Sequence, residues 1–180
     1  MKATGIVRRV DDLGRIVIPK EIRRTLKIRE GDPLEIYTEK DGGVIFRKYS
    51  PMGELLDFAT QICEAIADST GRVAAVSDRD CIIAISGAPK RELLEKNNSK
   101  ELDKLMENRR AYRYTGEDAL LPVAEGVGRY HLGVAVPILC QGDLIGCVML
   151  LLTENERPMG EAEQQLAQTV AGFLGKQMEN

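Results

Sequence analysis

The sequence has little of what most metal sites and many active sites are built from. Its 180 residues include no tryptophan, a single histidine and four cysteines. No two cysteines have C-x-x-C spacing, so a zinc site with cysteine and histidine ligands is poorly supported. We expect the cysteines to be reduced thiols in the protein core. The alternative is a disulfide between Cys140 and Cys147, which flank an expected hairpin turn.

Long apolar stretches are also missing. No segment approaches the roughly 20 uncharged residues of a membrane-spanning helix, and the residues from Met1 to Gly5 do not have the apolar core of a signal peptide. The composition, 43% hydrophobic and 29% charged, is that of an ordinary globular protein. These features predict a cytoplasmic protein without membrane contact.

Charge is distributed unevenly along the chain. Residues 1–50 hold 12 Lys and Arg against 8 Asp and Glu, a net charge of +4, whereas residues 51–180 hold 13 against 20, a net charge of −7. Within residues 1–29 the balance is 9 to 3. A small basic segment joined to an acidic one indicates a module that binds a polyanion, attached to a second module with another task.

The segment before Ser50-Pro51 has the pattern of a small, mainly β domain. Apolar alternation predicts strands at both sides of a turn at 11–14, and Pro19 suits the first position of a short helix that carries Ile22 and Leu26 on one face. A hairpin around the turn at 40–43 follows. The expected strands are 5–10, 15–18, 34–39 and 44–49.

Residues 51–180 predict a mixed α/β arrangement, so the whole chain is expected to be α+β. Ser50-Pro51 would begin a helix that ends near Gly71, and Asn98 would cap a helix with Leu102, Leu105 and Met106 on its buried side. A final helix begins near Gly160. Strands are expected at 73–76, 81–85, 132–139 and 144–152.

The two outer helices of this second segment carry apolar residues at helical spacing. We expect each apolar seam to be divided between the sheet and another subunit, which would give a four-helix contact and a tetramer. The candidate oligomerisation residues are Leu55, Ala59, Ile62, Ile66, Leu166, Val170, Phe173 and Leu174.

The first segment resembles a known family of DNA-binding regulators. The stretch from Asp11 to Leu26, DDLGRIVIPKEIRRTL, is similar to the AbrB/SpoVT family, and the similarity continues to Pro51. The resemblance implies a β-barrel of swapped hairpins formed by two chains over residues 1–51. Residues 52–180 resemble a GAF domain, which implies a sensing or oligomerisation module. The whole chain is similar to those members that activate and repress genes during endospore formation.

The resemblance also implies which residues contact DNA. The family's DNA-contacting arginines correspond to Arg8, Arg15, Arg23 and Arg24, and a guanidinium group binds phosphate or a guanine edge through two hydrogen bonds. If the turn at 11–14 holds four residues, Arg8 and Arg15 share a face of the hairpin. Four further basic residues are candidates that either contact phosphate or only carry surface charge: Lys2, Arg9, Lys20 and Lys27.

The form of the nucleic acid follows from what this segment lacks. Residues 1–29 contain no aromatic residue to stack on unpaired bases, so duplex DNA fits better than a single strand or an RNA loop. No long recognition helix is expected, which argues against a helix-turn-helix protein. Contacts through a short helix and loops favour recognition of backbone and shape, and hence deformable or AT-rich sites.

No enzyme chemistry is predicted for the second segment. His131 has no nucleophile motif beside it, and we expect it on the surface between a loop and a strand. No cofactor is implied, although a small molecule of unknown identity bound near residues 111–131 remains an alternative. A ligand-gated metabolic regulator and the antitoxin of a toxin–antitoxin pair are the other functions considered; antitoxins usually carry a short acidic tail in place of a second domain.

The small size of the first segment leads to a testable expectation. Domains of about fifty residues are marginally stable alone, and this one has no disulfide or metal to hold it. A polypeptide of residues 1–50 should therefore fold only as a dimer, with a thermal midpoint that rises with protein concentration. A stably folded monomer whose midpoint does not depend on concentration would contradict this expectation.

Overall fold

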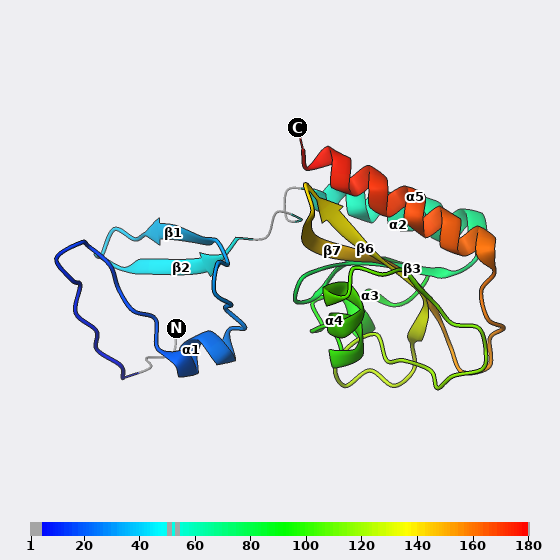
Figure 1. Cartoon of the computed structure of the whole chain (residues 1–180), viewed down its shortest axis with the longest axis horizontal. Helices are drawn as coiled ribbons and strands as arrows, with labels where there is room; N and C mark the ends of the chain where they lie inside the picture. The colour runs from blue at the N-terminus through cyan, green and yellow to red at the C-terminus, as the bar shows by residue number, and fades with distance from the viewer. Residues whose placement is uncertain (1–4, 50–51, 53–54, 180) are drawn as a thin grey trace. The chain divides into compact units, whose positions relative to one another are not determined.

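A computed structural model describes residues 5–49, 52 and 55–179 of the chain. The chain divides into two compact units, Met1–Tyr49 and Ser50–Asn180 (Figure 1).

The first unit contains one short helix and one hairpin. Helix α1 spans Lys20–Thr25, and strands β1 (Leu34–Thr38) and β2 (Val44–Lys48) pair antiparallel, with Ile36 opposite Phe46. These elements agree with the expected helix and second hairpin. Gly42 supplies the positive φ of 89° that the turn between the strands requires.

The expected first hairpin is not a pair of strands in the single chain. The turn itself is present, because the amide of Gly14 donates to the carbonyl of Asp11 at 3.0 Å. However, the described residues on both sides of it, 5–10 and 15–18, have no strand structure. Apolar side chains in these segments lie open to solvent, among them Val7 at 85% and Val17 at 71% exposure. The prediction of two strands is therefore wrong for the isolated chain, in whose described part these apolar side chains remain open.

The second unit is built on a five-stranded antiparallel sheet. Its strands lie in the order β4-β3-β7-β6-β5. The longest pairing joins β6 and β7, which form the hairpin expected around Gly142. In chain order the elements are α2 (Leu56–Thr70), β3 (Val73–Asp78), β4 (Ile82–Ser86), α3 (Lys90–Leu93), α4 (Lys100–Glu107), β5 (Tyr112–Arg113), β6 (His131–Cys140), β7 (Asp143–Leu152) and α5 (Glu161–Gln177).

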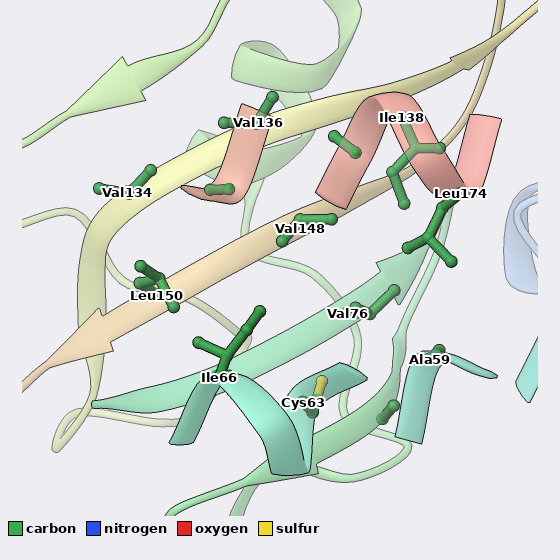
Figure 2. Packing of buried hydrophobic residues seen from close by; sticks show 14 of the residues in the cluster. Ala59, Cys63, Ile66, Val76, Val134, Val136, Ile138, Val148, Leu150 and Leu174 are labelled. Atoms are coloured by element: carbon green, nitrogen blue, oxygen red, sulfur yellow. The ribbon is translucent and has the colours of Figure 1, made fainter. Parts of the chain in front are cut away.

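Helices cover both faces of this sheet (Figure 1). Helix α2 packs on β3 and β4, and α5 packs on β6 and β7, whereas α3 and α4 lie on the opposite face. Figure 2 shows the first of the two resulting cores, in which Leu174 of α5 lies near Ile138 and Ile66 of α2 lies near Leu150. Because both faces are covered, the consecutive residues 145–152 of β7 are all buried, which explains the continuous apolar sequence there.

The ends of the helices correct two expectations. Helix α2 ends as predicted, with Gly71 in a left-handed conformation, but it begins at Leu56, and the expected cap Ser50 lies outside the described residues. Helix α4 is capped by Ser99, whose Oγ accepts from the amide of Leu102 at 3.0 Å. Asn98, the predicted cap, is buried and donates from its amide group to the carbonyl of Asp78 at 3.2 Å.

Helix α5 turns part of its apolar seam to the sheet, together with small residues that the sequence analysis did not single out. The residues that it buries are mostly small: Ala167, Ala171, Leu174 and Gly175. Small side chains allow the helix axis to approach the strands closely, and a Cβ at Gly175 would overlap the carbonyl oxygen of Leu139. Leu166 and Val170 are half-buried, and Phe173 is 44% exposed.

The cysteines are all free thiols, as expected. Cys140 lies opposite Asp143 and Cys147 lies opposite Pro137, so the alternative disulfide between these two cysteines is not formed. Burial raises the pKa of Cys63 to about 12 and raises the pKa of Cys147 as well. Both thiols are therefore protonated at neutral pH and contribute as small apolar core residues.

Two glycines of α5 provide a test of this close packing. Gly175→Ala should destabilise the protein by about 1–3 kcal/mol, because the added methyl group meets the backbone of β6. Gly172→Ala is the matched control: a Cβ there meets nothing within 4 Å, and the gain in helix propensity should stabilise by up to about 1 kcal/mol. Urea unfolding of the full chain measures both; equal effects would argue against the observed helix–strand approach.

Candidate nucleic-acid interface

Helix α1 presents two of the four candidate arginines to solvent. Arg23 and Arg24 are both exposed and lie in the last turn, where positive charge interacts favourably with the helix dipole. Glu21 occupies the first turn, which suits the opposite end of the dipole. Ile22 is half-buried on the other side of the helix. The local sequence thus directs the two guanidinium groups outward.

Arg15 is held by a contact that the sequence analysis missed. Its Nε donates to Oδ2 of Asp11 at 2.7 Å, and its backbone amide donates to Oδ1 of Asp11, also at 2.7 Å. Both hydrogen bonds lower the pKa of Asp11, and the one from the backbone amide has the larger effect. Aspartate at the start of a turn commonly accepts such backbone hydrogen bonds, so the turn sequence carried a usable signal.

The same turn changes the expected register of the hairpin. The amide of Asp11 donates to the carbonyl of Arg15 at 3.0 Å, so Asp11, and not Val10, lies opposite Arg15. The parity argument that placed Arg8 beside Arg15 is therefore wrong for this chain. Arg8 is exposed and stays a candidate through the family resemblance alone, and Arg9 is exposed as well.

The remaining basic candidates differ in their surroundings. Lys20 is exposed at the start of α1. Lys27 is half-buried just after this helix and has a positive φ of 51°. Lys2 lies outside the described residues. Lys20 and Lys27 flank the arginines of α1 in sequence, so the structure places a run of basic side chains along this helix.

The candidate oligomerisation residues fall into two groups. Leu55, Ala59, Ile66 and Leu174 are buried inside the unit's own core, so in this fold they contact the sheet. Ile62, Leu166, Val170 and Phe173 are half-buried or exposed. A residue that the sequence analysis missed, Phe58, is 48% exposed and lies four positions before Ile62 on α2.

These residues follow helical spacing along the edge of the buried side of each helix, where Ile62, Leu166 and Val170 also pack against the unit's core. On α2, Phe58, Ile62 and Ala65 are separated by four and three residues; on α5, Leu166, Val170 and Phe173 are separated in the same way. The two helices cover neighbouring strands of the sheet, because β3 pairs with β7. We call these six residues the outward stripe. The sequence carried a usable signal for Phe58, because this residue lies one helical turn before Ile62.

The loops of the second unit show no arrangement typical of catalysis. His131 is 9% exposed and begins β6, opposite Leu152, so the prediction of a surface histidine is wrong. A hollow of about 420 Å³ is lined by polar residues of two loops: Gly128, Arg129, Thr153, Glu154 and Asn155. Among the described residues no group of acids, cysteines and histidines could hold a metal ion. Nor is any described helix long and apolar enough to cross a membrane.

Sequence comparisons agree with the division into two units. The family described as "Stage V sporulation protein T C-terminal, transcription factor" matches residues 54–179, and the family described as "Antidote-toxin recognition MazE, bacterial antitoxin" matches residues 7–53. The chain is 47% identical to the transition state regulatory protein AbrB of Bacillus subtilis over 74 residues, which are 41% of this chain and 71% of that protein.

A solved structure and a full-length relative complete the comparison. The GAF domain of a phosphoenolpyruvate-protein phosphotransferase from Coxiella burnetii has a TM-score of 0.52 and 18% identity, covering 68% of this chain and 80% of that chain. This likeness shows a GAF fold. Over 182 residues, 99% of each protein, the chain is 48% identical to stage V sporulation protein T of Bacillus subtilis. The chain therefore belongs to the stage V sporulation protein T family of transcription factors.

Proposed function

We propose that this chain regulates transcription during endospore formation by binding double-stranded DNA through the exposed basic residues of its first unit. The observation that carries the proposal is the exposed pair Arg23 and Arg24 on α1, within the part of the chain that is similar to AbrB. Arg8 and Arg15 complete the contact, with Lys2, Arg9, Lys20 and Lys27 as auxiliary phosphate ligands. The protein would act on the nucleoid, in the cytoplasm, as activator and repressor and not as an enzyme.

The first unit would bind DNA as a dimer. Among its described residues only Pro19 is buried, while Ile6, Val7, Val10 and Val17 are exposed by 41% or more. So much open apolar surface on so small a unit calls for a partner. A second copy supplies strands for residues 5–18 and brings two arginine sets together, because a twofold axis doubles every contact.

The second unit, residues 52–180, would join two such dimers into a tetramer. Its outward stripe carries apolar side chains that a single chain leaves partly open, among them Phe58 at 48% and Phe173 at 44% exposure. A GAF fold also allows a small-molecule effector, for which the polar hollow beside Arg129 is a place to look. The similarity to antitoxins ends at residue 53, and a folded second unit follows it, so we favour a regulator over an antitoxin.

The DNA contact is tested by removing the arginines of α1. Arg23→Ala/Arg24→Ala should abolish most genomic binding sites, because each dimer loses four phosphate-binding groups. The measurement is genome-wide occupancy beside the wild type. In vitro, log K for the wild type should fall with log salt at a slope of about −5 to −7.

The matched control removes the same charge elsewhere in the unit. Lys40 and Arg47 belong to the second hairpin and are exposed, and neither is a candidate DNA contact. Lys40→Ala/Arg47→Ala should retain most genomic sites and a slope near that of the wild type. Equal losses in both double variants, or a wild-type slope near zero, would reject the assigned contact.

The tetramer is tested at the centre of the outward stripe. Phe173→Glu should convert tetramers into dimers, because a carboxylate is costly to bury in an apolar interface. Gln168→Glu adds the same charge to an exposed position of α5 outside the stripe and should leave the mass unchanged. Sedimentation equilibrium measures both variants; a tetramer in Phe173→Glu would show that the subunits meet elsewhere.

A further inference from the structure

Helix α1 ends in a left-handed cap that is formed by a lysine. Lys27 has a φ of 51°, a conformation that is unfavourable for residues with a side chain and that glycine usually supplies at this position. The amide of Lys27 donates to the carbonyl of Arg24 at 3.3 Å, and the amide of Ile28 donates to the carbonyl of Arg23 at 2.7 Å. These two hydrogen bonds form a Schellman motif. The carbonyls that it satisfies therefore belong to the two arginines of the proposed DNA contact.

The carbonyl of this capping residue is held from the hairpin. Lys48, at the end of β2, donates from Nζ to the carbonyl oxygen of Lys27 at 3.0 Å. The same Nζ lies 3.4 Å from Oδ2 of Asp32, whose side chain is only 3% exposed. Oδ2 of Asp32 also accepts from the amide of Arg29 at 2.8 Å. One ion pair thus connects strand β2, the helix cap and the loop after the helix.

This connection matters because α1 has few other constraints within the chain. The helix is six residues long, no side chain caps its N-terminus, and none of its residues is fully buried. A helix of this length is not stable alone. Contacts at its ends therefore contribute to its direction relative to the hairpin, and the contact of Lys48 with the cap reaches across from β2.

We propose that Asp32 and Lys48 are positioning residues for DNA binding: their ion pair stabilises the left-handed cap at Lys27 and so fixes where Arg23 and Arg24 stand. The inference rests on the proposed contact of these two arginines with DNA. Asp32 itself is no DNA ligand, because a carboxylate repels phosphate. Lys48 acts through the carbonyl oxygen of Lys27 and its salt bridge to Asp32.

Asp32→Asn distinguishes positioning from simple electrostatics. The change removes a negative charge from the DNA-binding unit, so electrostatics alone would tighten DNA binding. Positioning predicts the opposite, a loss of affinity on the order of tenfold, because the charge that orders Lys48 is gone. Fluorescence anisotropy of the full chain on a labelled AT-rich duplex, at several salt concentrations, measures the affinity. Unchanged or tighter binding would overturn the inference.

Lys48→Met is compared with Lys40→Met, since each removes one positive charge from the same hairpin. Lys48→Met should flatten the salt slope toward that of Arg23→Ala/Arg24→Ala, whereas Lys40→Met should keep the wild-type slope. The slope depends on how many phosphates the bound protein neutralises, so a loss of folded protein alone does not change it. A wild-type slope in Lys48→Met would overturn the inference.

The final comparison combines the variants. In the background of Arg23→Ala/Arg24→Ala, Lys48→Met should change the slope no further; an additional decrease would show that Lys48 contacts phosphate itself and would overturn the inference. If the two arginine substitutions alone leave the slope unchanged, the proposed DNA contact fails instead. Should Lys48→Met yield no folded protein, Lys48→Gln, which retains a hydrogen-bond donor, is measured in the same comparison with the same criteria.

Discussion

The first unit leaves most of its described apolar side chains open to solvent, and both the proposed assembly and the proposed DNA contact follow from this. Burial of apolar surface is the main favourable term in folding, yet within the described residues 5–49 only Pro19 is buried. In the proposed dimer another chain completes the unit, and a chain that is unfolded at its DNA-binding end would not bind DNA. Assembly and DNA binding are in this way one equilibrium.

The second unit changes the conditions of that equilibrium. It has two apolar cores of its own, one on each face of the sheet, and does not need a partner to fold. An interface along α2 and α5 would hold first units at a high effective concentration, which favours their pairing even when the protein is dilute. The same linkage gives an effector of the GAF-like unit a means to influence DNA binding without touching DNA.

Local sequence patterns predicted the elements that the chain completes by itself. The hairpin of β6 and β7, the end of α2 at Gly71 and the α+β class were all correct, because alternation and turn residues act locally. Strands at 5–10 and 15–18 were not found among the described residues of the single chain; in the proposed dimer a second copy would supply their partners. The large apolar residues of α5 were anticipated, but the small residues that let the helix approach the sheet closely, Ala167, Ala171 and Gly175, carry no such signal. The contact of Lys48 with Lys27 joins residues far apart in the sequence, and no local pattern reports it.

The two proposed contacts, with DNA and between second units, use different chemistry. The arginines of the first unit attract phosphate, while the second segment, with its net charge of −7, repels it, so added subunits contribute no unspecific DNA contacts. The outward stripe is apolar, and apolar contacts are not weakened by salt, whereas contacts between arginine and phosphate are. A rise in ionic strength should therefore release DNA from an assembly that remains intact. DNA can be released without loss of the assembly only if different residues bind DNA and join the second units.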